Sequence, residues 1–310
     1  MIQSTRILLL TSLAMIAFAS NSLLCRGALK QNDIDAASFT FVRIFSGAVA
    51  LWVLVSLQRK ERRVKTPGVS NGSYFTSTPS PQRQLLRTGS WSSALALFVY
   101  AAAFSFAYLA LSAGTGALLL FGAVQATMIF WGLQKGERLS MIQTVGFIVA
   151  VTGLIILVFP GLSAPPLAGS ILMVAGGVAW GIYSLRGQKE RNASTATTGN
   201  FVRAVPFSIV LFIAFTPWTH IDLAGFAYAV ISGAVTSGMG YVIWYKALPG
   251  LKAASAATVQ LSVPVLAATG GILLLGEPIT PRYMLASVAV LGGIALVIAT
   301  PHSRLNSSTK

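Results

Sequence analysis

The chain has 310 residues, of which 55% are hydrophobic and only 9% are charged, and its mean hydropathy is +0.73. Soluble domains usually carry about 25% charged residues, so this composition excludes an ordinary water-soluble domain. One helical crossing of a bilayer needs about 20 apolar residues, and the length therefore predicts an all-α polytopic membrane protein. Lys and Arg number 22 against seven Asp and Glu, an excess that nucleic acid, anionic lipid or membrane topology could each explain.

Cysteine and histidine are too scarce for most metal chemistry. Cys25 is the single cysteine, which excludes an internal disulfide framework and a site built from several cysteines. His220 and His302 stand far apart, near expected helix ends, and offer little material for a zinc or haem centre. We therefore expect no metal site and no cofactor.

Ten apolar windows, interrupted by turn residues or charges, predict ten transmembrane helices. The third and fourth form one apolar stretch over twice as long as a membrane is thick, so we divide it at the small residues 112–116. The seventh window is barely long enough and carries Arg203 and Pro206. The expected spans are 7–25, 36–57, 91–113, 114–133, 141–159, 167–185, 201–217, 223–245, 253–275 and 283–300.

The first window also has a second interpretation, as a secretory signal peptide. Arg6 precedes an apolar core, and the small-residue run at 17–19 precedes Ser20. We prefer a retained helix, because the internal repeat described below uses residues on both sides of that point.

The distribution of positive charge predicts the orientation in the membrane. Seventeen of the Lys and Arg residues fall in the N-terminal tail, the C-terminal tail and the loops after the second, fourth, sixth and eighth spans. The opposite side holds Arg26, Lys30 and Arg282. By the positive-inside rule, we expect a multi-pass protein of the cytoplasmic (inner) membrane with both termini in the cytoplasm. The basic excess is then mostly a topology signal, and we expect no nucleic-acid partner.

Short segments recur in the two halves of the chain. Phe-Val-Arg occurs at 41–43 and at 201–203, and Arg-Gly at 26–27 and at 186–187, both at an offset of 160. Gly-Glu occurs at 136–137 and at 276–277, before the fifth and tenth spans. Gly153 and Gly293 keep this second offset, which is 140.

These matches divide the chain into a five-helix repeat over 1–160, a second over 161–300 and a cytoplasmic tail over 301–310. Residues 58–90, rich in charge, Ser and Pro, predict a disordered cytoplasmic linker inside the first repeat. Because five is odd, the second repeat enters the membrane from the opposite side. The expected fold is therefore two inverted five-helix repeats around a central cavity.

Over nearly its whole length, the chain resembles the drug/metabolite transporter superfamily, specifically its EamA type. The resemblance implies a ten-helix basket around a central cavity and export or exchange of small metabolites. The linker over 58–90 is longer than this family leads us to expect. The segments that carry the resemblance are 38–43, 179–184, 240–248 and 257–265 running on to 275–278.

The expected function is therefore a secondary transporter of small metabolites working by alternating access, as an exporter, facilitator or exchanger. Amino-acid-like or aromatic compounds are candidate substrates, and the lipid bilayer is the other expected partner. We expect the transporter to be a monomer or a homodimer. No Asp or Glu lies within the middle of an expected span, which favours a facilitator or exchanger over a proton-driven pump. The alternative is a membrane-embedded lipid-handling protein or enzyme, but the sequence offers no catalytic triad order or phosphate loop, and we expect no catalytic residue.

Charged side chains supply two kinds of candidate functional residue. Arg43 and Arg203 are the only charges inside the expected spans, where each would either hold backbone carbonyls as a gating contact or capture a carboxylate or phosphate. Glu137 and Glu277 stand just before the fifth and tenth spans, where a carboxylate suits the positive end of a helix.

Aromatic and amide side chains supply the remaining candidates. Aromatic residues at helical spacing would form either a substrate cavity or an interfacial belt. Uncharged amides inside spans would make either interhelical hydrogen bonds or substrate contacts. The aromatic candidates are Tyr100, Trp180, Tyr183, Tyr241 and Trp244, and the amides are Asn21, Gln125 and Gln260.

Overall fold

The protein is described here by a computed structural model that covers residues 2–65, 88–136, 138–161, 164–187, 192–247 and 259–299. Within these ranges the chain is helical, and its only extended pairing is a single bridge between Ile34 and Ile221. The same ranges contain nine helices long and apolar enough to cross a membrane, together with one shorter apolar helix. The expected class, an all-α polytopic membrane protein, is confirmed.

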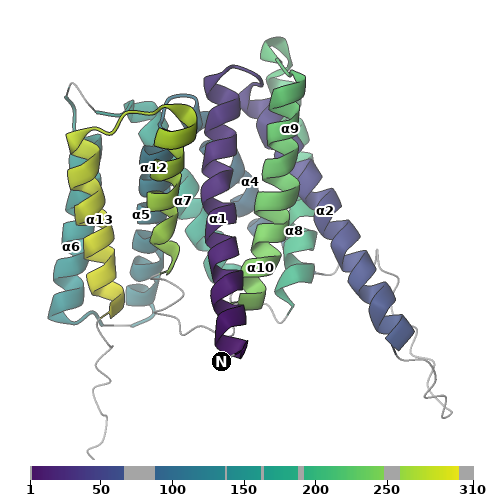
Figure 1. Ribbon diagram of the computed structural model, residues 1–310, viewed down its shortest axis with the longest axis horizontal. Helices are drawn as coiled ribbons and strands as arrows, with labels where there is room; N and C mark the ends of the chain where they lie inside the picture. The colour runs from purple at the N-terminus through teal and green to yellow at the C-terminus, as the bar shows by residue number, and fades with distance from the viewer. Residues whose placement is uncertain are drawn as a thin grey trace, which may run out of the picture.

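The helices run side by side in one bundle, and α1 begins at the end of the bundle where α13 finishes (Figure 1). The segments α9, η2 and α10 follow one another without interruption and together make one span. The elements are α1 (Ile2–Lys30), α2 (Ala36–Lys65), α4 (Trp91–Tyr108), α5 (Ala113–Gln134), α6 (Met141–Val158), α7 (Leu167–Gly187), α8 (Ala193–Ala214), the 3₁₀ turn η1 (Thr216–Trp218), α9 (Leu223–Ile231), the π-helix η2 (Ser232–Met239), α10 (Gly240–Ala247), α12 (Ser262–Leu275) and α13 (Pro281–Ala299).

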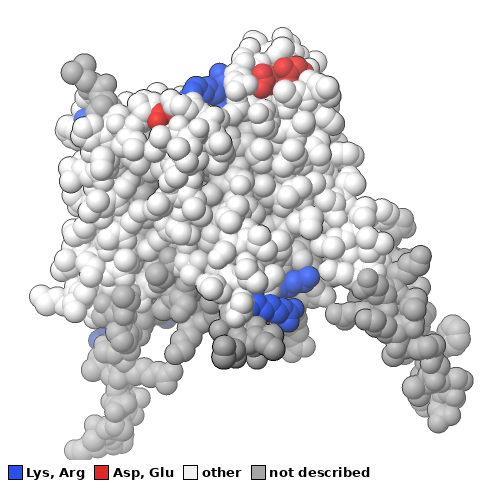
Figure 2. Space-filling view, in the orientation of Figure 1, with Lys and Arg blue, Asp and Glu red and all other residues white. Residues whose placement is uncertain are grey.

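The outer surface of the bundle suits a bilayer. Charged side chains lie towards its upper and lower ends in Figure 2, and the broad band between them is uncharged in this view. Large apolar side chains, among them Leu8, Ile148, Val210 and Leu273, are exposed on this bundle. Exposed apolar surface of this extent is stable against hydrocarbon but not against water, which makes the chain a multi-pass membrane protein.

Short polar side chains fix where several helices begin. Ser112 accepts a hydrogen bond from the Thr115 amide and thereby starts α5, which separates α4 from α5 within the long apolar stretch. Ser140 and Gln143 form a reciprocal capping box at the start of α6. Asp35 accepts from the amides of Ala37 and Ser38 at the start of α2. Oxygen acceptors at these positions satisfy amides that the first helical turn leaves unpaired.

Two helices are longer than the hydropathy windows predict. The first continues to Lys30, so Arg26 and Lys30 lie in its last turns and not in a loop. The second continues to Lys65, so the first eight residues of the expected linker are helical. Lys, Arg and Glu are good helix formers, and a helix can therefore continue where its apolar stretch ends. Residues 66–87 of that expected linker lie outside the described residues, as do 253–258 of the ninth expected span and the tail 301–310.

The seventh span also begins earlier than predicted, at Ala193 instead of residue 201. Its first two turns carry Thr195, Thr197, Thr198 and Asn200, which are polar and yet buried. Asn200 accepts a hydrogen bond from the Ser90 amide just before α4. A hydropathy window stops at such residues, because it cannot see that their polar groups are satisfied inside the protein.

The packing partners of the helices follow a regular pattern. α6 packs on α13, α2 on α8 and α5 on α12, and each pair joins helices at the same position of the two expected repeats. Two further contacts match across the halves. In the first set, α4 packs on α7, and α1 packs on α9, η2 and α10. In the second set, α5 packs on α7, and α1 packs on α12. In each of these sets the two contacts join the same two positions of the expected repeats, with the halves exchanged.

Glycines on both helices allow a close approach at the α6–α13 contact. A Cβ atom on Gly153 would lie 3.0 Å from a methyl of Val290, and a Cβ on Gly293 would lie 3.0 Å from the Cβ of Ala150. Ala150 and Val290 are separated by the same 140 positions that separate the two glycines. Gly153 therefore lets α6 approach Val290, and Gly293 lets α13 approach Ala150.

Candidate functional site

A small cavity lies inside the bundle between residues from both halves of the chain. Its volume is about 20 Å³, which is room for about one water molecule. A metabolite could enter only after the surrounding side chains or helices move apart. The lining residues are Phe18, Asn21 and Ser22 on α1, Tyr100 and Phe104 on α4, Leu120 and Phe121 on α5, Trp180 on α7, Thr236 on η2 and Tyr241 on α10.

Trp180 is the centre of the aromatic wall of this cavity. Its ring centroid lies 4.8 Å from that of Tyr100 and 4.9 Å from that of Tyr241. Tyr183 stacks on it at 5.5 Å, and Trp244 instead meets Phe18 edge-on at 6.2 Å. These separations fall in the range that aromatic pairs prefer. Of the five aromatic candidates, Tyr100, Trp180 and Tyr241 line the cavity, whereas Tyr183 and Trp244 each contact a lining residue, Trp180 and Phe18 respectively.

A chain of hydrogen bonds connects Arg43 to the cavity wall. Arg43 Nη2 donates to the Tyr100 hydroxyl at 2.9 Å, and Asn21 Nδ2 donates to the same hydroxyl at 3.3 Å. Asn21 Oδ1 in turn accepts from Ser232 Oγ at 2.5 Å and from Thr236 Oγ1 at 3.3 Å. Because the Tyr100 hydroxyl accepts two bonds here, its own proton remains available for a third partner.

The eighth span contains a π-helix beside this chain of hydrogen bonds. Ser232 and Thr236, which bind Asn21, and Ser237, which accepts from Arg43 Nε at 3.3 Å, all lie in η2. Gly233 lies so close to α2 that an added Cβ would overlap the carbonyl oxygen of Arg43. π-Helical turns inside α-helices are rare and frequent at functional sites. In the sequence this segment is distinguished only by its Gly and Ser residues, which are typical of close helix packing.

Arg43 is almost completely buried, at 2% exposure. Its guanidinium lies 5.1 Å from the ring centroid of Tyr100 and 4.8 Å from that of Phe104. Its Nη1 atom is buried and has no hydrogen-bond partner among the described residues. The aromatic faces attract the positive charge without satisfying that donor.

Arg203, the counterpart of Arg43 in the sequence repeat, has different surroundings. It is half-buried, and its Nη1 donates to the backbone carbonyls of Thr88 at 2.5 Å and of Gly199 at 3.0 Å. It thereby joins α8 to the segment that precedes α4. The two arginines therefore do not form one charged site.

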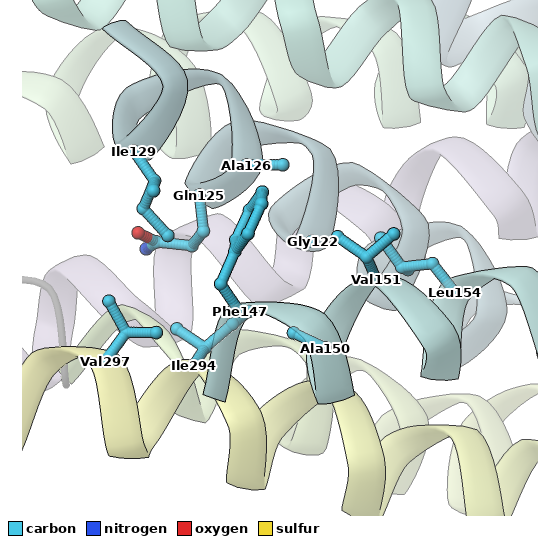
Figure 3. A pocket seen from close by; sticks show the side chains of 10 residues that line it. All are labelled: Gly122, Gln125, Ala126, Ile129, Phe147, Ala150, Val151, Leu154, Ile294 and Val297. Atoms are coloured by element: carbon cyan, nitrogen blue, oxygen red, sulfur yellow. The ribbon is translucent and has the colours of Figure 1, made fainter. Parts of the chain in front are cut away.

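The amides Gln125 and Gln260 do not join Asn21 at the cavity. Gln125 lies in a separate, mostly apolar pocket between α5, α6 and α13, where Figure 3 shows its side chain beside Ile129 and Phe147. Gln260 is half-buried just before α12 and is not among the residues that line the central cavity. A single sequence does not tell which face of a span each amide occupies.

Glu277 stabilises a helix start, but not the one that the sequence predicts. Its Oε2 accepts from the Ala113 amide at 2.8 Å, at the start of α5, whereas Thr280 accepts from the Tyr283 amide at the start of α13. Gly276 ends α12 in the left-handed conformation, with φ of 61°. The chain turns at Gly276, and α13 takes its cap from Thr280, four residues later. Glu137, the other expected helix-end carboxylate, lies outside the described residues.

The second oxygen of Glu277 binds Arg26, with 3.1 Å between Nε and Oε1. Arg26 Nη1 also donates to the carbonyls of Tyr108 at 2.8 Å and Leu109 at 3.2 Å, at the end of α4. One ion pair therefore connects the end of α1, the end of α4, the start of α5 and the turn after α12. Repeat comparison singles out Arg26 and Glu277 separately, but does not indicate that they meet.

Across the ranges that the structure describes, no group of three or more His, Cys, Asp or Glu side chains could hold a metal ion. Cys25 is buried and unpaired. The cavity lining itself offers hydroxyl, amide and indole groups, and the Arg43 guanidinium contacts this lining through the Tyr100 hydroxyl.

Comparisons with known proteins identify the family. The EamA-like transporter family matches residues 167–299. PA1977 of Pseudomonas aeruginosa, an uncharacterized protein, is 53% identical over 294 residues, which cover 95% of each chain. The uncharacterized transporter YoaV of Bacillus subtilis is 20% identical over 271 residues, 85% of this chain and 87% of its own.

Two further similarities concern half the chain and the fold. The threonine/homoserine exporter RhtA of Escherichia coli is 32% identical over 153 residues, which are 46% of this chain and 50% of the exporter. A solved crystal structure of a protein with 16% identity superposes with a TM-score of 0.61 over 93% of this chain and 96% of that one. The chain belongs to the EamA-like transporter family of the drug/metabolite transporter superfamily.

Proposed function

We propose that this membrane transporter moves small metabolites through the central cavity by alternating access. The observation that carries the proposal is the cavity itself: α1 and α4 of one half and α7, η2 and α10 of the other contribute side chains to it. Binding sites of transporters built from repeats commonly lie between the halves, near the middle of the membrane. A cavity this small belongs to an occluded conformation, from which either side could open.

We also propose that residues 1–160 and 161–300 are inverted repeats. The matched neighbours of the helices and the reciprocal contacts of Gly153 and Gly293 support this relation. Two similar halves can exchange their conformations, so that the cavity opens first to one side and then to the other. The common end of α1 and α13 in Figure 1 suits an even number of crossings. Together with the positive charge in the expected cytoplasmic segments, it supports an inner-membrane protein with both termini in the cytoplasm.

In that orientation the ion pair of Arg26 and Glu277 lies at the outer end of the bundle. We assign it as the contact that holds the outer side closed, because it joins parts of both halves: α1, α4 and α5 on one side, and the turn between α12 and α13 on the other. Opening this side would require the pair to separate or to move with one of its partners. A monomer contains the cavity and this ion pair in full, and a homodimer is compatible with both.

Small amino-acid-like compounds are the first candidate substrates. RhtA, named as a threonine/homoserine exporter, is similar over half its length, and the cavity combines aromatic faces with hydroxyl and amide groups. Among the described lining residues there is no Asp, Glu or His that could carry a proton through the cycle. This supports a facilitator or exchanger over a proton-coupled pump.

Counterflow in proteoliposomes tests the proposal. Vesicles loaded with unlabelled L-threonine should accumulate external radiolabelled L-threonine transiently, and Trp180→Ala should remove at least 90% of that flux. Trp218→Ala is the matched control, because Trp218 is 68% exposed and lies outside the cavity. Equal flux in the wild type and in Trp180→Ala would reject the cavity as the pathway.

The same vesicles can test the lipid-handling alternative. A fluorescent phospholipid added to the bilayer should cross no faster with the protein than without it. Rapid lipid exchange without threonine counterflow would favour the alternative over a metabolite transporter.

A further inference from the structure

The Arg43 guanidinium has a buried donor for which the fold provides no acceptor. Nη2 donates to Tyr100 and Nε to Ser237, but Nη1 is buried without a partner in the part of the chain that the structure describes. Buried polar atoms in folded proteins are nearly always hydrogen-bonded, so a buried exception requires an explanation.

The charge of Arg43 also lacks a counter-ion. The one ion pair formed by the described residues joins Arg26 and Glu277. Asp35 and Asp222 are used at the starts of α2 and α9, where each accepts backbone amide hydrogens. Arginine keeps its proton under all ordinary conditions, so Arg43 cannot escape this cost by becoming neutral. A buried, unpaired cation is unfavourable, and an anion that enters its surroundings is stabilised.

The position of Arg43 connects it to the cavity. Tyr100 and Phe104 line the cavity, and both rings lie within 5.1 Å of the guanidinium carbon of Arg43. The Tyr100 hydroxyl accepts a hydrogen bond from Arg43 Nη2 and a second one from the Asn21 amide. A rotation of Tyr100 would therefore expose the two terminal nitrogens of Arg43, Nη1 and Nη2, to a ligand beside Trp180.

We infer that Arg43 is the anion-recognition residue of the cavity and binds the carboxylate of a small organic substrate through Nη1 and Nη2. A carboxylate has two oxygens whose spacing matches the guanidinium fork, and it would satisfy the orphan donor and the charge together. Tyr100 would lose its hydrogen bond from Arg43 Nη2, and its hydroxyl would then donate a hydrogen bond to the bound carboxylate. This inference rests on the proposed function, because it identifies the chemical class of substrate that the same cavity selects.

A purely structural role for Arg43 predicts a different pattern. An arginine that only braces Tyr100 and Ser237 needs two of its nitrogens and gains nothing from an added carboxylate. Arg203 provides the matched control: it is the repeat counterpart, and it donates to backbone carbonyls away from the cavity lining.

Thermal unfolding of the purified full-length protein, followed by tryptophan fluorescence, tests the inference without transport. Sodium benzoate, benzamide and inorganic phosphate are compared at constant ionic strength. Benzoate offers a carboxylate on an aromatic ring, benzamide the same ring without charge, and phosphate an anion without the ring. A ligand that binds the folded state raises the unfolding temperature.

We expect benzoate to raise the unfolding temperature by several degrees, with an apparent affinity at least tenfold above that of benzamide. Arg43→Gln should abolish this preference, Arg43→Lys should weaken it about tenfold because lysine lacks the fork, and Arg203→Gln should leave it intact. If Arg43→Gln does not fold, the comparison rests on Arg43→Lys. Equal effects of benzoate and benzamide in the wild type would overturn the inference, as would no effect of either. A phosphate shift that exceeds the benzoate shift would overturn the assignment to a carboxylate.

Failure of this inference differs from failure of the proposed function. Threonine counterflow with no preference for carboxylates over amides would leave the transporter in place and remove Arg43 as the anion site. A benzoate shift that Arg43→Gln abolishes, in a protein without counterflow, would support the anion site and reject transport of threonine.

Discussion

Arg26 and Glu277 are 251 positions apart in the chain and form an ion pair with 3.1 Å between Nε and Oε1. The same carboxylate accepts the Ala113 amide, and the same guanidinium donates to the carbonyl of Tyr108. Four segments therefore meet at one pair of charges. Both side chains are mostly buried, at 15% and 7% exposure, so their interaction is screened less than that of a surface pair.

Replacing Glu277 should loosen this end of the bundle. Glu277→Gln removes the charge from the ion pair and weakens the cap on α5, and we expect a loss of stability of about 1–3 kcal/mol. Cys25, the neighbour of Arg26, is buried and is the only cysteine of the chain. A membrane-impermeant maleimide should therefore label Cys25 at least tenfold faster in Glu277→Gln than in the wild type. Asp35→Asn, at the start of α2, is the control. Equal labelling of Glu277→Gln and the wild type would contradict the assignment of this ion pair as the contact that holds the outer side closed.

Paired glycines at the contact of α6 and α13 make a second prediction about stability. A Cβ on Gly293 would lie 2.7 Å from the Ala150 amide nitrogen, whereas a Cβ on Gly292 meets no atom within 4 Å. Gly293→Ala should therefore cost about 1–3 kcal/mol, because the helices must move apart. Gly292→Ala should be neutral or slightly stabilising, since alanine favours the helix. Unfolding temperatures measured in the same detergent provide the comparison, and equal effects of the two substitutions would contradict this packing.

Gly153 lies at the same contact of α6 and α13 and gives a further prediction about stability. A Cβ at this position would lie 2.8 Å from the Cβ of Ala289, so Gly153→Ala should cost about as much as Gly293→Ala, again about 1–3 kcal/mol. The double variant should cost less than the sum of the two, because one separation of α6 from α13 relieves both overlaps. Strict additivity would show that the two glycines lie in independent contacts.

The π-helix gives a prediction that concerns the cavity. Gly233→Ala would push a methyl group into the Arg43 carbonyl and the Ser46 hydroxyl, and it should therefore shift η2 away from α2. We expect counterflow to fall at least tenfold as Ser237 leaves Arg43 and Thr236 leaves Asn21. Gly238→Ala is the milder control, because its nearest neighbour would be 3.2 Å away. Unchanged counterflow in a folded Gly233→Ala protein would show that the close approach of η2 to α2 has no part in transport.

Hydropathy and turn residues predict much of this fold, because each span must satisfy the bilayer by its own composition. The division at Ser112 is one example, since a short polar residue there both breaks an overlong stretch and caps α5. The start of α8 is not predictable in this way. Thr197 and Thr198 are buried by tertiary packing, which a sequence window does not contain.

The candidate site is predictable in its residue types more than in its contacts. Helical spacing groups Trp180 with Tyr183, and the structure brings Trp180 together with Tyr100 and Tyr241. Nothing local in the sequence indicates that Glu277 caps a helix that begins 164 positions earlier, or that the span after Ile231 becomes a π-helix. Both features depend on neighbours that only the folded bundle provides.

Cysteine labelling from both sides of the membrane tests directly whether the cavity opens to each side in turn. Ser22 lines the cavity and is 1% exposed, and Ser22→Cys can be combined with Cys25→Ala to leave one reporter thiol. In right-side-out and inside-out vesicles alike, an impermeant maleimide should label this thiol completely over time, because the cavity opens in turn to each side. Labelling from one side alone, or from neither, would contradict alternating access through this cavity.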